Sequence, residues 1–228
     1  EHGYEIWRTD GTAEGTALAA EILPGPPGGL ASELVELKGS LYFAADDQIH
    51  GYELWKSDGT QAGTVVVADI NPGPDSSYPW QFLVAGETLY FSAESPTFGI
   101  ELWKSDGTEA GTGLVKDIAP GPESSYPLNF SEIGGKLFFA ASNSAHGWEP
   151  FVSDGTEAGT NLLLDVYPGS GSSLLSSFPD ADFPPKKAGG SLYFVADDGT
   201  HGEELWKTDG TPAGTALVKD IATGPALS

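Results

Sequence analysis

Short apolar and aromatic runs recur along the chain, separated by Gly, Pro and acidic residues. The run Ser-Leu-Tyr-Phe-Ala at residues 40–44 returns in similar form at residues 88–91, 136–139 and 191–194. Runs of this length that are rich in aromatic residues are typical of buried strands. No window shows the apolar spacing i, i+3, i+4, i+7 of an amphipathic helix. The pattern therefore predicts an all-β chain.

Three further strands are predicted for each copy of the pattern. One example of each lies at residues 53–57, 64–70 and 80–85, respectively. Leu54 alternates with Glu53 and Trp55, which predicts a half-buried strand. Asp-Gly between the second and third strands predicts a hairpin, because Gly tolerates φ > 0. The Pro-Gly-Pro segment at residues 71–77 cannot continue a ladder and predicts a longer connection.

The phrase Glu-Ile-Trp-Arg-Thr-Asp-Gly-Thr recurs five times, with copies that start at residues 5, 53, 101, 149 and 204. The first four copies start 48 residues apart and the last step is 55. The surplus falls near residues 169–185, which are predicted to be an irregular insertion. A unit of about 48 residues with four antiparallel strands is typical of a β-propeller blade.

Strand counting predicts four complete blades and, at the N-terminus, the last two strands of another, eighteen strands in all. A single propeller domain is expected over residues 1–228. Two arrangements remain open, namely a five-bladed ring with one half blade or a segment of a larger propeller. We favour the segment, because residue 1 falls inside a repeat. The absence of Met agrees with a processed or partial chain.

The copy at residues 101–112 and the Leu-Val-Lys-Asp-Ile that follows at 114–118 resemble the bacterial family named after its ELWxxDGT repeat. The resemblance covers nearly the whole chain. It implies propeller-like proteins that are secreted or lie on the cell surface, with no established chemistry. The fourth copy departs from the pattern, since Pro150 and Phe151 replace Leu and Trp, and residues 169–185 lie outside it.

The amino-acid composition excludes several kinds of binding partner. The chain has 33 acidic and 10 basic side chains, and its net charge of −23 repels nucleic acid and anionic membranes. The absence of Cys excludes disulfides and thiolate zinc sites. No apolar run reaches the roughly 18 residues of a transmembrane helix. We expect an extracellular, cell-surface or periplasmic location. The content of 39% hydrophobic residues argues against a disordered chain.

All four histidines occupy one slot of the repeat, three residues before the Glu of the phrase, and the remaining copy carries Phe98. They could form a repeated ligand-binding set, for which His50, His146 and His201 are the candidates. Alternatively, each imidazole caps a turn and packs on its neighbour. Phe98 in the same slot favours packing.

The tryptophans divide into two groups. Trp7, Trp55, Trp103 and Trp206 recur in one slot, and this periodic use predicts burial between blades. Trp80 and Trp148 lie off the pattern. They are therefore the candidates for an exposed ligand-binding surface.

Acidic residues recur in three slots. The Asp of Asp-Gly-Thr is expected to accept backbone N–H bonds within its turn. The Glu of the phrase is expected to pair across strands or with the next blade. The third slot ends the last strand of each unit, and a ring of such carboxylates would be neutralised by hard cations. It comprises Glu21, Asp69, Asp117, Asp165 and Asp220.

The densest oxygen donors are two acidic pairs, each within one loop. They make Ca²⁺ the candidate metal, although neither pair has the spacing of an EF-hand loop. The candidate metal ligands are Asp46, Asp47, Asp197 and Asp198.

The sequence contains no catalytic motif for a serine hydrolase, zinc protease, phosphate-binding loop or dinucleotide site. Near-identical blades favour a non-catalytic scaffold or binding propeller that contacts a protein or glycan in a surface assembly. A lectin-like sugar binder is the first alternative. A glycan-acting hydrolase with an asymmetric acidic cleft near the insertion is the second.

Overall fold

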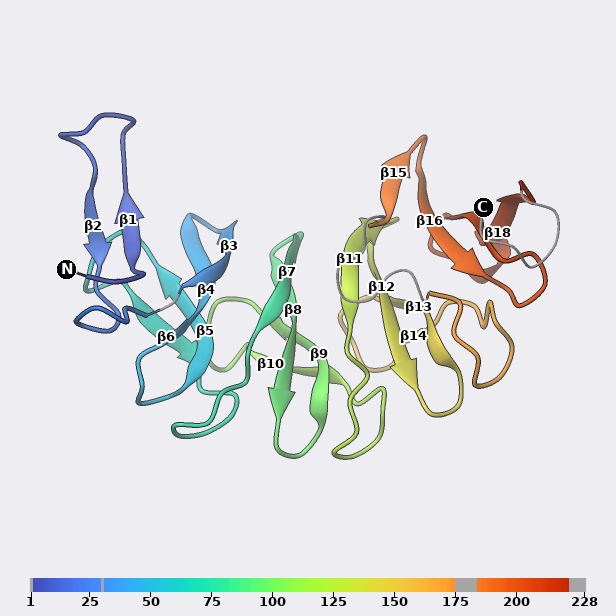
Figure 1. The fold of residues 1–228 in the computed structure, drawn as a ribbon, viewed down its shortest axis with the longest axis horizontal. Helices are drawn as coiled ribbons and strands as arrows, with labels where there is room; N and C mark the ends of the chain where they lie inside the picture. Colours follow the sequence, from blue (N-terminus) through green and yellow to red (C-terminus); the bar gives the residue numbers. More distant parts are fainter. Residues whose placement is uncertain (1, 30, 175–183, 222–228) are drawn as a thin grey trace. The chain divides into compact units, whose positions relative to one another are not determined.

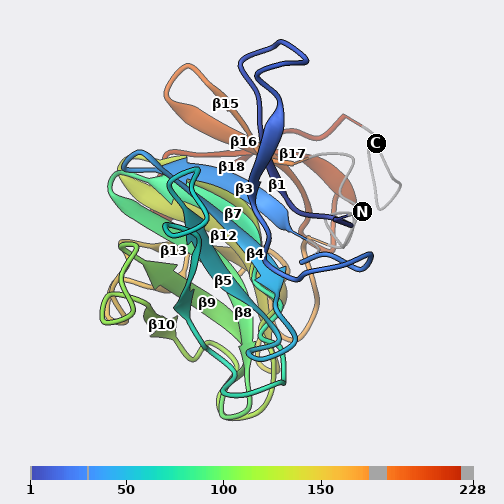
Figure 2. The ribbon, with the colours of Figure 1, turned by 90° about the vertical axis from the view of Figure 1, so that its left-hand side faces the viewer.

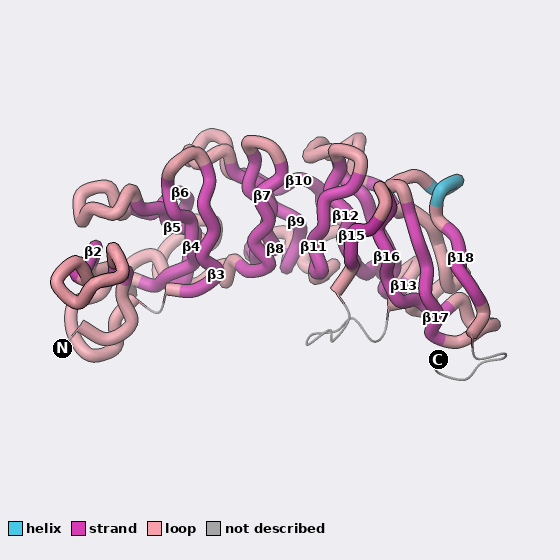
Figure 3. Tube along the Cα trace, turned by 90° about the horizontal axis from the view of Figure 1, so that it is seen from above, coloured by secondary structure: helices cyan, strands magenta, loops and turns pink. Residues whose placement is uncertain are grey.

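The structure is a computed structural model that describes residues 2–29, 31–174 and 184–221. Within these residues every element is a strand except the short 3-10 turn η2 at Pro212–Gly214 (Figure 3). No helix among them is long and apolar enough to span a membrane. The strands are β1 (Ile6–Arg8), β2 (Ala17–Ala20), β3 (Ser32–Leu37), β4 (Ser40–Asp46), β5 (Tyr52–Ser57), β6 (Val65–Ala68), β7 (Trp80–Ala85), β8 (Thr88–Ser95), β9 (Gly99–Ser105), β10 (Gly113–Lys116), β11 (Leu128–Ile133), β12 (Lys136–Asn143), β13 (Gly147–Ser153), β14 (Asn161–Leu162), β15 (Lys186–Ala188), β16 (Ser191–Asp197), β17 (Glu203–Thr208) and β18 (Ala216–Lys219).

Consecutive strands pair to form four sheets of four strands, β3–β6, β7–β10, β11–β14 and β15–β18 (Figure 1). The strands β1 and β2 form a separate hairpin, drawn in dark blue in Figure 2. Each four-stranded sheet follows the chain without a crossover, as in a propeller blade. The described residues thus contain the eighteen predicted strands in the predicted grouping, and the prediction of an all-β fold of propeller blades is confirmed.

The chain forms two compact units, which divide within β9 and again within β10. Unit 1 comprises Glu1–Gly99 and Trp103–Leu114, and unit 2 comprises Ile100–Leu102 and Val115–Ser228. A single domain over residues 1–228 therefore stays a prediction. Most of the predicted insertion at 169–185 lies outside the described residues, which omit 175–183.

The strand β5, the third of its blade, has buried side chains on both faces. Leu54 is 0% exposed and packs with Leu89 and Phe91 of the following sheet. Trp55, its neighbour in β5, packs with Ile6 and other residues of the β1–β2 hairpin. The prediction of a half-buried strand is wrong for β5, because packed residues cover both of its faces. The equivalent strand β17 keeps the predicted alternation, with Leu205 37% exposed between the buried Glu204 and Trp206. Apolar burial of this kind is the main stabilising contribution to the fold.

The hairpin between β13 and β14 explains the Asp-Gly-Thr phrase and the Gly-Thr that follows it. Asp154 Oδ1 accepts hydrogen bonds from Thr156 N at 2.9 Å and from the Thr156 hydroxyl at 2.6 Å. Gly155 has φ +84°, which disfavours any side chain. At Gly159 a Cβ atom would lie 2.0 Å from Asp154 Oδ1, so only glycine fits. The prediction that this Asp binds backbone N–H groups of its own turn is confirmed.

Candidate binding surface and the carboxylate network beside it

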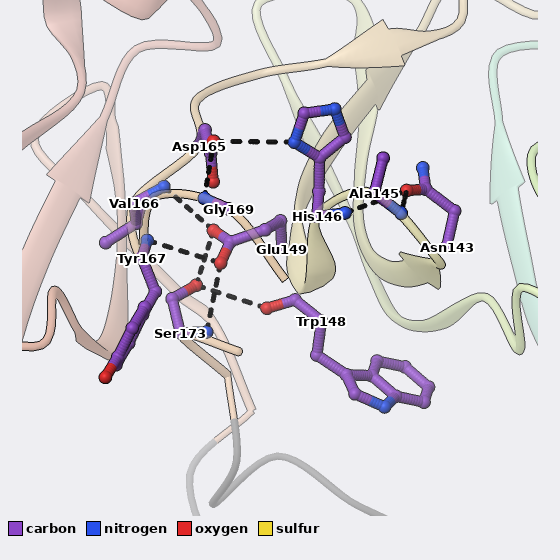
Figure 4. A network of polar contacts seen from close by, with 10 residues as sticks. All are labelled: Asn143, Ala145, His146, Trp148, Glu149, Asp165, Val166, Tyr167, Gly169 and Ser173. Carbon is purple, nitrogen blue, oxygen red and sulfur yellow. Dashed lines mark hydrogen bonds and ion pairs between the residues drawn. The ribbon is translucent and has the colours of Figure 1, made fainter. Parts of the chain in front are cut away.

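A buried carboxylate holds the linker after β14. Glu149 in β13 is 0% exposed, and Figure 4 shows its carboxylate surrounded by the residues that follow the strand. Oε2 accepts from Val166 N at 2.9 Å and from the Ser173 hydroxyl at 2.7 Å. Oε1 accepts from Tyr167 N at 3.3 Å and Ser173 N at 3.1 Å. One side chain therefore satisfies three backbone N–H groups in a segment that cannot form a ladder.

The same arrangement recurs in the preceding copies. Glu53 accepts from Ile70 N at 3.0 Å and from the Ser77 hydroxyl at 2.6 Å. Glu101 accepts from Ala119 N at 3.0 Å and from the Ser125 hydroxyl at 2.6 Å. Instead of pairing with a neighbouring strand of its own sheet, as one form of the expectation had it, the side chain binds the linker that leads to the next blade. Contact with the next blade is made through that linker, since Ser77 O accepts from Glu94 N of β8 at 2.8 Å. The Ser that lies 24 residues after Glu53, Glu101 and Glu149 is the sequence signal that could have revealed the contact.

Burial controls the protonation of these acids. Desolvation raises the pKa of Glu53, Glu101 and Glu149 to about 7, and the hydrogen bonds from serine and backbone donors oppose the rise. The exposed Asp154 shows the opposite direction. Its pKa is lowered, because the Thr156 hydroxyl and N–H donate to its carboxylate.

Three acids of the third slot, Asp69, Asp117 and Asp165, bind glycines of the linker. Asp165 Oδ2 accepts from Gly169 N at 3.3 Å and lies 3.4 Å from Nδ1 of His146 (Figure 4). Asp117 makes the equivalent bond to Gly121 N at 3.1 Å. These carboxylates are therefore used to shape the linker, and the proposed ring of cation ligands stays a prediction.

The predicted ligand-binding histidines each lie beside a carboxylate. Nδ1 of His50 is 2.8 Å from Asp47 Oδ2, and Nδ1 of His201 is 2.7 Å from Asp198 Oδ2. The hydrogen bond with Asp198 raises the pKa of His201. These contacts favour the interpretation that the imidazoles cap turns. A ligand-binding role for His50, His146 and His201 stays a prediction.

The four candidate metal ligands also make local bonds. Asp47 Oδ1 and Asp198 Oδ1 accept from the backbone N–H groups of the histidines, and Asp46 Oδ1 and Asp197 Oδ1 accept from residues two positions on. Among the described residues, no three His, Asp or Glu side chains come together in a way that could hold a metal ion. Calcium binding at these pairs stays a prediction.

The tryptophans follow the predictions only in part. Trp55 and Trp206 are buried as expected, but Trp7 in the same slot is 53% exposed. Trp7 is exposed because, in the described residues, no sheet covers its face of the β1–β2 hairpin. Trp80 and Trp148 were expected to be exposed, and both are half-buried.

Two aromatic pairs come together through residues that the sequence predictions missed. The Tyr78 ring lies 6.1 Å from Tyr52, with an interplanar angle of 31°. The Tyr126 ring lies 6.5 Å from Trp148, with an angle of 33°. Tyr78 and Tyr126 are 60% and 39% exposed. The signal in the sequence is the shared Ser-Ser-Tyr-Pro at residues 76–79 and 124–127.

Both exposed tyrosines have an unusual backbone conformation. The φ angle is +46° at Tyr78 and +50° at Tyr126, which is rare for a bulky residue. The backbone N–H of Tyr78 donates to Tyr52 O at 3.1 Å, and that of Tyr126 donates to Ile100 O at 3.2 Å. These bonds fix the conformation that presents each ring beside the third strand of a blade.

A hollow of about 610 Å³ lies near the second pair. It is lined by Ala119, Pro120, Glu123, Ser124, Ser142, Asn143 and Ser144. Ser142 lies directly opposite Trp148 in the β12–β13 ladder, and its N–H donates to Ser125 O at 2.9 Å. Ser142 therefore connects the hollow to the Tyr126–Trp148 pair within unit 2. In Figure 4 the Trp148 ring points away from the Glu149 network.

A scan against protein-family models finds no match, and no curated protein matches the chain. Among solved structures, the chain is similar to a puromycin-hydrolyzing peptidase of Mycobacterium tuberculosis, at 14% identity and a TM-score of 0.50, over 94% of this chain and 32% of that one. The computationally designed Ika8 protein matches at 10% identity and a TM-score of 0.46, over 92% and 54%.

An α-L-arabinofuranosidase from Clostridium thermocellum matches at 16% identity and a TM-score of 0.36, over 86% of this chain and 74% of that one. The chain spans about half the length of the designed protein and about a third of the peptidase. Identities this low bear on the fold alone. The repeated four-stranded sheets by themselves describe a chain built of β-propeller blades.

Proposed function

We propose that the chain is a non-catalytic binding or scaffold propeller that contacts a protein or glycan in an extracellular or cell-surface assembly. One observation carries the proposal: the recurring carboxylates bind backbone of their own copy, whereas exposed aromatic rings stand beside them. Both oxygens of Glu149 already accept hydrogen bonds, and its side chain is fully buried. A general acid or base must reach the substrate, and this carboxylate does not.

The location and the kind of partner are part of the proposal. The resemblance to ELWxxDGT-repeat proteins supports an extracellular or cell-surface site. The net charge of −23 disfavours acidic partners and favours neutral or basic ones. Exposed aromatic rings supply large apolar contact areas at low entropic cost, as binding surfaces commonly do.

The test measures binding and turnover on the same samples. The fluorescently labelled chain is incubated with insoluble polysaccharides and bacterial envelope fractions, and retention is measured alongside the release of reducing ends and peptides. We expect retention that falls only modestly with salt, with no product released. Absence of retention on every material would contradict a binding role. Product release that an Asp or Glu substitution abolishes would establish the hydrolase alternative.

A further inference from the structure

We infer that the hollow at the β12–β13 turn binds an oligosaccharide without acidic groups, with the Tyr126–Trp148 pair as its stacking surface. The inference rests on the proposed function and deepens it by naming the site and the ligand class. It is carried by three features that meet within unit 2. They are an exposed aromatic pair, a hollow lined by hydroxyl and amide groups, and a single carboxylate at the hollow.

The aromatic pair provides an apolar surface beside a polar one. The Tyr126 ring is 39% exposed and lies 6.5 Å from Trp148. Because Tyr126 adopts φ +50°, its conformation is costly and is retained only where surrounding bonds determine it. The C–H face of a pyranose ring is apolar and matches such a surface, while the hydroxyl groups at the ring edge need polar partners.

The hollow supplies those partners. Ser124, Ser142, Ser144 and Asn143 line it with hydroxyl and amide groups, which can both donate and accept hydrogen bonds. Ser124 is already positioned, because its hydroxyl accepts from Ile100 N at 2.9 Å. A volume of about 610 Å³ suits two or three sugar rings, in the usual range for small-ligand pockets.

The negative charge of the chain and of Glu123 determines which sugars the hollow favours. Glu123 is the one ionisable group in the lining, and it accepts hydrogen bonds from hydroxyl or amino groups. The net charge of −23 adds a field that repels uronic acids and sulfated sugars. The site therefore favours neutral sugars or sugars with amino groups over acidic ones.

The experiment is titration calorimetry of the full chain with cellohexaose, chitohexaose and hexagalacturonate. We expect binding of a neutral hexamer and no heat from hexagalacturonate. Trp148→Ile copies Ile100, the residue that the preceding copy carries in this slot. Tyr126→Asn removes the ring and keeps a residue that tolerates φ > 0. Each substitution should weaken binding about tenfold or more, since it removes the stacking contact.

Two further variants serve as controls. Tyr78→Asn makes the same change in the equivalent Ser-Ser-Tyr-Pro of unit 1 and should leave the affinity within about twofold. Glu123→Gln should leave neutral sugars unaffected and weaken an amino sugar, for which chitosan hexamer is the probe. Melting curves establish that each variant is folded, so a loss of affinity is not mistaken for unfolding.

The outcomes separate this inference from the function on which it rests. Retention on envelope material without binding of either neutral hexamer overturns the inference and leaves a protein-binding role. Binding that Trp148→Ile and Tyr126→Asn both leave unchanged places the sugar elsewhere and also overturns it. Tighter binding of hexagalacturonate overturns the charge argument. Failure of both retention and sugar binding contradicts the proposed function itself.

Discussion

Glu149 and Asp154 belong to the same strand–turn region of the β11–β14 blade, and both accept hydrogen bonds from backbone N–H groups. They differ in burial and in reach. Glu149 is 0% exposed and binds residues 17 to 24 positions away, whereas Asp154 is exposed and binds a residue two positions away. Similar bonds therefore have opposite effects on the pKa, which burial raises in Glu149 and hydrogen bonding lowers in Asp154.

The comparison shows two ways in which one repeat uses an acid. The Asp organises a local hairpin that any exposed Asp-Gly-Thr turn could form. The Glu replaces the missing ladder partners of a Pro-containing linker, so its contribution depends on the packed blade around it. Substitutions at the two positions should consequently differ in size and in pH dependence.

The largest expected effect is that of Glu149→Ala. It leaves the N–H groups of Val166, Tyr167 and Ser173 without their acceptor and creates a cavity. We expect a loss of about 3–5 kcal/mol in the free energy of unfolding, because buried donors lose their charged partner. Urea denaturation measures it. A loss below about 1 kcal/mol would mean that water replaces the carboxylate, and this would contradict the enclosed position of Glu149.

The pH dependence is the second effect. Folded Glu53, Glu101 and Glu149 have a pKa of about 7, above the ordinary 4.5, so between these values the folded state binds more protons than the unfolded state. Their contribution to stability therefore falls as the pH rises from about 4.5 to 7, on the order of 1–3 kcal/mol per group.

Urea titrations at pH 5 and pH 7.5 measure this slope, and Glu149→Gln should reduce it because one titrating group is removed. A stability that increases over this range, or an unchanged slope in Glu149→Gln, contradicts the assignment. The Asp residues of the Asp-Gly-Thr turns affect stability over a separate, lower pH range. Their lowered pKa, as at Asp154, contributes stability above the ordinary value of 3.8 that is lost as the pH falls below it.

The smallest expected effect is that of Asp154→Ala. It removes two bonds to Thr156 in an exposed turn, where water can replace them. The loss of stability should be at most about one third of that for Glu149→Ala. Asp154→Asn serves as the matched control, because it keeps the accepting oxygen and should lie closer to the unsubstituted chain. Equal losses at Asp154 and Glu149 would contradict the distinction between local and buried acids.

Much of the fold could be predicted from particular residues. The Leu-Tyr-Phe runs and the Leu-Phe-Phe of the third copy predicted β4, β8, β12 and β16, and the 48-residue step grouped the strands into blades. Asp154 behaved as expected because an Asp-Gly-Thr turn is a local structure, determined by neighbours in the chain. The site was less predictable. Trp148 was singled out, but its partner Tyr126 was not, because their contact joins residues from different elements.

The sequence by itself determined the strands, their order within each blade and the acidic turns, since these depend on short-range pattern and backbone chemistry. Tertiary structure decided which members of a repeated slot are buried. Trp55 and Trp7 carry the same side chain in the same phrase, yet among the described residues Trp55 packs against the β1–β2 hairpin and is buried, whereas Trp7 is 53% exposed. It also decided that Glu149 is enclosed by its own linker. Burial depends on what packs against a residue, and a repeat in one dimension does not contain that information.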